Sequence, residues 1–434
     1  MPVSALAAST LEQEARALLT RLFRLKSFGV IMPMVSAADV GAAAATAIER
    51  YLIFGRRELR RLVENYLLWL RGPAVQHFSA AEAQRRLAFL RLKFNAVLTQ
   101  FDIFSDVLTQ RCEHENGVWL AGLDVAAADA LTLPGRYFSP PPLMVYLDRG
   151  HGAAIRRART RLPGGGRNPV ALVRIPRERM VGSGIASSLV HEVGHQGAAL
   201  LGLVSSLQGA LQAEQWRRPA SERTAWRLWE RWISEIVADF WSVARVGVAA
   251  TQGLMGVVSL PRAFVFRINV DDPHPFPWIR VKVSTAIGEA LFPHPQWPRL
   301  ARLWEDLYPR AGLPAASLEI IRALESTIPQ FVRLLLGHRP RSLRGRSLHE
   351  VFPLAERQPA RLRAKFRSWR RHPRQLIEAT PTMFFAVLGQ AKEDRLLGPE
   401  EESGIVAERL QRWALRRALG PTRSLRARAH AIAA

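Results

Sequence analysis

The stretch SSLVHEVGH, Ser187 to His195, decides how the rest of this sequence is interpreted. It contains the pattern H-E-x-x-H, formed by His191, Glu192 and His195. On an α-helix, residues four apart lie on one face, so both imidazoles can reach a single ion. Zinc binds imidazole nitrogens at about 2.0–2.1 Å in tetrahedral sites, and Glu192 would lie where it can hold a water and take its proton. The alternative is a helix whose histidines only pack or are solvated.

A second segment, about forty residues further on, carries two carboxylates. Glu235 and Asp239 are also four residues apart, within WISEIVADFW (232–241). Apolar residues surround them, and a helix that is apolar all round is usually buried. Buried carboxylates need a cation or several donors, and two on one face repel each other. Zinc meets this need if Glu235 is a third ligand and Asp239 accepts the second N–H of a zinc-bound imidazole, most simply that of His191. The alternative is a salt bridge to an arginine.

H-E-x-x-H followed by E-x-x-x-D resembles the arrangement in gluzincin zinc metallopeptidases. The forms HEVGH and EIVAD look most like the group of CaaX prenyl endopeptidases and related membrane-quality-control proteases. The resemblance covers about 60 residues, 183–245. It implies roles for five residues: zinc ligands His191, His195 and Glu235, general base Glu192, and supporting carboxylate Asp239. The chain departs from those relatives because they mostly span membranes, and because Phe240 stands where a basic residue usually follows the Asp. Substrate identity is therefore not implied.

Composition bounds the broad class of the protein. The chain has 434 residues, 48% hydrophobic and 23% charged, which is enough for a substantial core. The formal net charge is +24, and all but five of the 61 basic residues are Arg. Twelve basic residues lie between His338 and Arg374, against two glutamates. This region predicts either a solvated helical face in an Arg-rich chain, which we favour, or a surface for an anionic partner.

Several classes of protein are disfavoured by the sequence. Cys112 is the only cysteine, so the chain has no internal disulfide and no Cys-rich zinc site. Residues 1–12 lack the features of a secretory signal, and no apolar run reaches the ~18 residues needed to span a bilayer. We therefore expect a soluble, cytoplasmic protein without a membrane span, with export lacking a classical signal as the alternative. The sequence does not specify an oligomeric state.

The residue patterns predict a predominantly helical α+β fold. We expect a zincin-like catalytic core, 117–285, with a small sheet beside two metal-binding helices. Helical regions flank it at 1–116 and at 286–434, the latter Arg-rich. Compact apolar runs predict strands at 143–147 and 170–175. We expect 170–175 to be an edge strand that pairs with an extended substrate.

Helix boundaries are predicted from capping residues and breakers. Thr10 is the predicted cap of the first helix, and either Ser183 or Ser187 caps the helix that carries the two histidines. That helix is expected to end at Gly202. Cys112 to Glu115 is predicted to be a polar surface turn.

A Pro-rich segment, DDPHPFPWIR (271–280), carries one histidine and one arginine. Its position after the third predicted ligand favours a rigid loop that lines the cleft. His274 is our candidate to donate a hydrogen bond to the oxyanion formed during peptide hydrolysis. Tyr308 and His294 compete for this role, and a solvent-exposed turn is the alternative.

Together these patterns predict a zinc-dependent peptidase that acts on a peptide or protein substrate. Glu192 would take the proton of the attacking water and pass it to the leaving amine. One alternative is a non-enzymatic helical binding or assembly protein, with a basic surface for an anionic partner and any zinc structural. Zinc-dependent hydrolysis of a substrate other than peptide is a third possibility.

Overall fold

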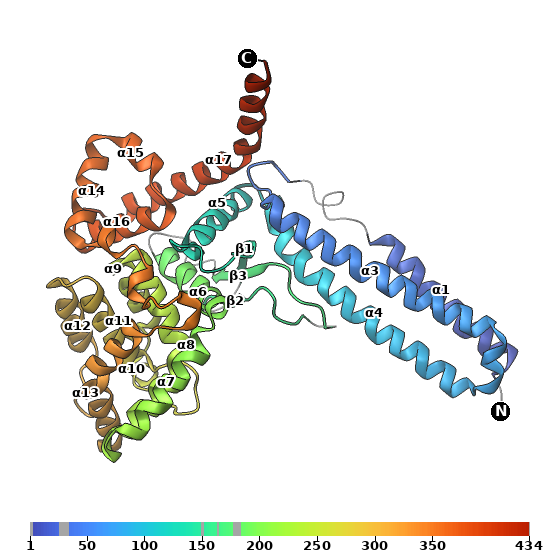
Figure 1. Cartoon of the computed structure of the whole chain (residues 1–434), viewed down its shortest axis with the longest axis horizontal. Coiled ribbons are helices and arrows are strands. Elements are labelled where there is room, and N and C mark those ends of the chain that lie inside the picture. The colour runs from blue at the N-terminus through green and yellow to red at the C-terminus, as the bar shows by residue number, and fades with distance from the viewer. Residues whose placement is uncertain (1–2, 26–33, 149–151, 163–164, 177–183, 434) are drawn as a thin grey trace. The chain divides into compact units, whose positions relative to one another are not determined.

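The computed structural model describes residues 3–25, 34–148, 152–162, 165–176 and 184–433 (Figure 1). The chain forms two compact units. The first comprises residues 1–121, 157–171 and 414–434, and the second comprises 122–156 and 172–413. Helices predominate and one small sheet is present, which confirms the coarse fold class. The division into regions 1–116, 117–285 and 286–434 stays a prediction.

The first unit is built on long helices around an apolar core. They are α1 (Ala5–Arg24), α3 (Ala42–Arg71) and α4 (Ala80–Thr109), with the short 3-10 helices η1 (Pro73–His77) and η2 (Gln110–Cys112). Ser79 begins α4 with a capping box, in which its side chain accepts from the Glu82 backbone while Glu82 accepts from the Ser79 backbone.

Two predictions about this unit are wrong. Ser4, not Thr10, caps α1, because its side chain accepts from the Ala7 N–H at 3.2 Å. Thr10 lies inside the helix and donates to a backbone carbonyl. The predicted turn at 112–115 is also displaced, because α5 (His114–Leu131) already begins there. Gly117 lies inside α5. Only glycine fits at this position, because a Cβ here would overlap the backbone of η2.

The second unit contains the predicted chemistry. Its helices are α6 (Gly184–Leu201), α7 (Leu203–Arg217), α8 (Ala220–Val246), α9 (Val248–Val258), α10 (Arg262–Val265), α11 (Pro277–Leu291), α12 (Gln296–Leu307), α13 (Ala315–Gly337), α14 (Pro359–Arg371), α15 (Pro373–Glu378) and α16 (Pro381–Glu393). Short 3-10 helices are η4 (Arg341–Leu343), η5 (His349–Val351) and η6 (Leu354–Arg357), and α17 (Pro399–Ala433) continues into the first unit.

Helix α8 lies at the centre of this unit. Helices α6, α7, α11, α13 and α16 all pack against it. Trp226, Trp229, Trp232 and Trp241, all on α8, are fully buried. The apolar surroundings of the two carboxylates in the sequence therefore indicated burial correctly.

The sheet has the strands β1 (Leu143–Asp148), β2 (Ala154–Arg156) and β3 (Ala171–Pro176), in the order β1-β3-β2. Both predicted strands are confirmed. The prediction that 170–175 is an edge strand is wrong, because β3 lies between β1 and β2, and Val173 pairs antiparallel with Ile155. A central strand has no unpaired edge for a substrate. Strand β2, which lies at an edge in the described sheet, packs against α6.

Helix α6 ends as predicted, with Gly202 in the left-handed region at a φ of 60°. Ser187 is not its cap, because this residue lies in the first turn and donates to the Gly184 carbonyl at 3.1 Å. Ser183 lies outside the described residues. Within the described ranges, no helix has both the length and the apolar character that crossing a bilayer requires.

Candidate metal centre

Two glycines let α6 approach α8 closely. A Cβ on Gly194 would lie 2.9 Å from the Trp241 Cβ and 3.0 Å from the Ala238 Cα. A Cβ on Gly197 would overlap the Trp241 ring. Real Cβ atoms do not approach this closely, so only glycine permits this contact. The close approach places the histidine face of α6 against the carboxylate face of α8.

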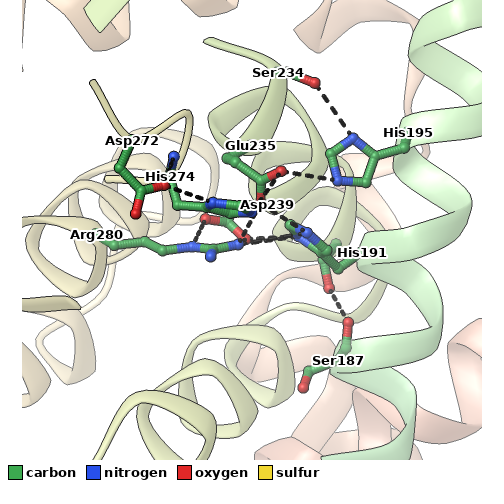
Figure 2. Close-up of polar contacts among 10 residues, drawn as sticks. Ser187, His191, His195, Ser234, Glu235, Asp239, Asp272, His274 and Arg280 are labelled. Atoms are coloured by element: carbon green, nitrogen blue, oxygen red, sulfur yellow. Dashed lines mark hydrogen bonds and ion pairs between the residues drawn. The ribbon is translucent and has the colours of Figure 1, made fainter. Parts of the chain in front are cut away.

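The structure brings His191, His195 and Glu235 together. Each offers one ligand atom, and these atoms all lie within 4.8 Å of one another. The Nε2 atoms of both histidines lie 3.3 Å from a Glu235 oxygen, one from each oxygen (Figure 2). Tetrahedral zinc with ligand bonds of about 2.0–2.1 Å separates neighbouring ligand atoms by roughly 3.3 Å. The donor types suit zinc, and each imidazole lies at about this spacing from one Glu235 oxygen.

Asp239 lies behind the first histidine. The Nδ1 of His191 is 2.8 Å from the Asp239 Oδ1, which directs the Nε2 toward Glu235. This is the arrangement predicted for a carboxylate that orients a metal-binding imidazole. The other histidine has a weaker partner, because Ser234 Oγ is 3.5 Å from the Nδ1 of His195.

Arg280 also reaches these carboxylates. Its Nε and Nη2 donate to the two Asp239 oxygens at 2.7 and 2.9 Å, and Nη2 lies 3.3 Å from Glu235 Oε2 (Figure 2). The side chain is only 13% exposed. Burial opposes its charge, but Asp239 and Glu235 raise the pKa of Arg280, so it stays a cation. The salt bridge to an arginine, which was the alternative for these carboxylates, is thus present, whereas the zinc interpretation stays a prediction.

The charges of the site are close to balanced when His191 carries a proton. Glu192, Glu235 and Asp239 can supply three negative charges, against one positive charge from Arg280 and one from protonated His191. Burial lowers the pKa of His191, but Asp239 and Glu235 outweigh it and raise that pKa to about 9. Burial also opposes ionisation of Glu235, yet hydrogen bonds from both imidazoles and the charge of Arg280 hold its pKa well below the usual range. With His191 protonated, the one negative charge left over is that of Glu192, whose ionisation burial opposes.

Glu192 differs from the other carboxylates. It is 7% exposed, and burial raises its pKa above the usual range. No hydrogen bond in the described part of the chain uses its carboxylate, although both imidazoles are close enough to influence its pKa. A carboxylate with a raised pKa, whose oxygens accept no hydrogen bond from the described residues, is suited to accept a proton.

His274 lies at the rim of the cluster. Its Nε2 is 3.7 Å from Glu235 Oε1, its Nδ1 is 2.8 Å from Asp272 Oδ1, and its side chain is 57% exposed. Its competitors are engaged elsewhere. Tyr308 donates to the Leu260 carbonyl, and His294 accepts from a backbone N–H at the start of α12.

Sequence reasoning missed the role of Arg280. The sequence predicts a rigid loop over 271–280, but α11 begins at Pro277 and Arg280 lies in its first turn. Two sequence features could have pointed to Arg280. Glu235 and Asp239 need a cation, and an arginine stands six residues after His274. Many arginines compete for such a pairing in this chain, so the sequence could not select it.

The chain matches no protein-family model, no curated protein and no solved structure.

Proposed function

We propose that the protein is a zinc-dependent peptidase of the gluzincin type. The observation that carries the proposal is the cluster of His191, His195 and Glu235, whose ligand atoms lie within 4.8 Å of one another in a partly buried site, with the carboxylates of Glu192 and Asp239 beside it. Glu192 supports a hydrolytic role rather than a purely structural one, because a structural zinc site needs no additional free carboxylate. The fold around this cluster is proposed to be zincin-like.

The residues divide the work of hydrolysis among them. When bound, zinc supplies a Lewis acid that lowers the pKa of water and polarises a peptide carbonyl. Glu192 accepts the proton of the attacking water and delivers it to the leaving amine nitrogen. Asp239 keeps the His191 ring oriented through its Nδ1–H. His274 donates a hydrogen bond to the oxygen that gains negative charge.

Substrate backbone would bind at the sheet. Strand β2 packs against α6, and it lies at an edge of the described sheet. An extended peptide can add to such an edge through main-chain hydrogen bonds, which contribute binding affinity but no sequence selectivity. Residues 154–156 therefore replace 170–175 as the candidate substrate-pairing strand.

The test is the substitution Glu192→Gln, with zinc content and peptide cleavage measured on the same preparation. The variant should keep about one zinc per chain by elemental analysis and lose roughly 10²–10⁴-fold in cleavage rate. Glu319→Gln, at an exposed position on α13, is the matched control and should change neither quantity. Cleavage by Glu192→Gln at the wild-type rate, or wild-type protein that binds no zinc, would overturn the proposal.

A further inference from the structure

A cavity of about 640 Å³ lies beside the N-terminal half of α8. Its polar lining comes from α7, from α8 and from the segment before α11. The residues that matter here are Gln208, Thr224, Arg227, Glu230, Arg231 and Asp271. Cavities of this size are large enough to take a substrate side chain.

The cavity and the metal cluster share two walls. One is α8, and the other is the segment 271–274, which follows α8 toward the cluster. Arg231 donates to the Asp271 carbonyl, the Trp232 Nε1 donates to the Asp272 carbonyl at 3.1 Å, and His274 lies 3.7 Å from Glu235. Figure 2 shows the far end of this segment, with Asp272 and His274 beside Glu235. The cavity therefore lies beside the same helix and the same segment as the cluster, on the N-terminal side of Glu235.

Helix geometry sets the distance between the two sites. Arg231 and Arg227 come four and eight residues before Glu235. With a rise of about 1.5 Å per residue, they lie roughly 6 and 12 Å along the axis. An extended peptide advances about 3.3 Å per residue. Dividing these distances by this advance places Arg231 and Arg227 beside a substrate residue about two to four positions from the cleaved bond.

Two carboxylates and two guanidinium groups line the cavity, so an anion is favoured only through the way in which these groups are paired. Glu230 is turned toward α7, where its two oxygens accept from the amides of Gln212 and Gln215 at 2.6 and 2.7 Å. Asp271 is the other lining carboxylate, against two guanidinium groups. Arg227 is exposed and forms no ion pair with any carboxylate in the described part of the chain. Arg231 holds the neighbouring segment through a backbone carbonyl.

We infer that this cavity is a subsite for a substrate carboxylate, located two to four residues from the bond that is cleaved. The inference rests on the proposed peptidase function and adds a substrate class to it. The carboxylate comes either from an Asp or Glu side chain or from a free peptide C-terminus. Both present the planar pair of oxygens that a guanidinium binds. Arg227 is the specificity-determining residue.

Cleavage of a peptide library, with the sites identified by mass spectrometry, tests the selectivity. Wild-type protein should enrich Asp and Glu at one position, or require a free C-terminus, and amidated peptides separate these two sources. Arg227→Gln should reduce the preference about fivefold, through KM rather than kcat, and Arg227→Glu should invert it toward Lys and Arg. Arg223→Gln, one turn earlier on α8 and outside the cavity lining, should leave it unchanged.

Binding separates failure of the subsite from failure of the peptidase. Labelled acidic and neutral peptides are titrated into Glu192→Gln protein, with and without Arg227→Gln, and followed by fluorescence anisotropy. Arg227-dependent binding of the acidic peptide without cleavage by wild type would keep the subsite and overturn the peptidase. Cleavage without acidic preference, or with a preference that Arg227→Glu leaves intact, would overturn the subsite alone. Absence of both cleavage and Arg227-dependent binding would overturn both.

Discussion

At the scale of single residues, Arg280 is the cation shared by a buried carboxylate, Asp239, and a partly buried one, Glu235. Arg280→Met would leave Asp239 and Glu235 without it, so we expect the metal-free protein to lose about 3–5 kcal/mol in free energy of unfolding. Arg280→Lys keeps the positive charge but loses the bidentate contact with Asp239. Its free energy of unfolding should therefore lie between those of wild type and Arg280→Met. Urea denaturation measures the change, and added zinc should restore part of the loss.

Arg302→Met is the control for the Arg280 substitutions, since Arg302 is exposed on α12 and has no ion pair within the described residues. It should change the free energy of unfolding by no more than about 0.5 kcal/mol. If Arg280→Met behaves like this control, Arg280 is not the cation on which the carboxylates depend.

The protonation of His191 makes zinc binding depend on pH. Its pKa is raised to about 9 in the metal-free site, so near pH 7.5 the imidazole carries a proton that zinc must displace. Affinity should therefore rise with pH until about 9, and binding at pH 7.5 should release about one proton. Calorimetric titration in two buffers of different ionisation enthalpy counts the protons. Release of none would show that His191 is neutral before zinc arrives.

Asp239→Asn tests the origin of that proton. The substitution removes a carboxylate that raises the pKa of His191, so it should reduce the proton release at pH 7.5. It should also weaken zinc binding by roughly 10–100-fold, because the ring loses its orienting partner. Unchanged affinity would remove Asp239 from the centre.

At the scale of elements, the centre depends on how closely α6 packs on α8. Gly194→Ala places a methyl group against Trp241 and Ala238, so the helices must separate and carry His195 away from Glu235. We expect a loss of about 1–3 kcal/mol in stability and weaker zinc binding. Gly209→Ala on α7 is the control, because a Cβ there meets nothing within 4 Å and alanine favours the helix. Equal behaviour of the two variants in thermal and zinc titrations would contradict this account.

At the scale of the whole molecule, the large positive charge gives less support to an anionic partner than its count suggests. Within 338–374, four arginines pair with carboxylates: Arg339 with Glu350, Arg357 with Glu356, Arg363 with Asp394, and Arg370 with Glu401. One of the four, Arg357, is only 4% exposed. The carboxylate partners of these arginines all belong to the second unit, so these positive charges are already paired within it. This favours the interpretation of the region as a solvated helical face.

Zinc should stabilise one of the two compact units and not the other. All three candidate ligands lie in the second unit. Zinc at 100 times its Kd adds about 2.7 kcal/mol to the free energy of unfolding, which should raise that unit's Tm by roughly 5 °C. Scanning calorimetry with zinc and with a chelator measures the shift, and His191→Ala should abolish it. A shift of every transition together, or of none, would contradict this assignment.

Much of the candidate site could be predicted because its parts are local. The spacing of His191 and His195, and that of Glu235 and Asp239, places each pair on one helical face whatever the rest of the chain does. The apolar surroundings of α8 likewise indicated burial. The strand positions and the end of α6 at Gly202 follow from equally local patterns.

The tertiary structure alone decided how these parts meet. It placed β3 between its neighbours, selected Arg280 from among many arginines, and showed why Gly194 must lack a side chain. Strand order and the pairing of residues 41 positions apart depend on packing between elements, which no local pattern encodes. Periodicity and spacing therefore determined which residues share a face, whereas packing determined which faces touch.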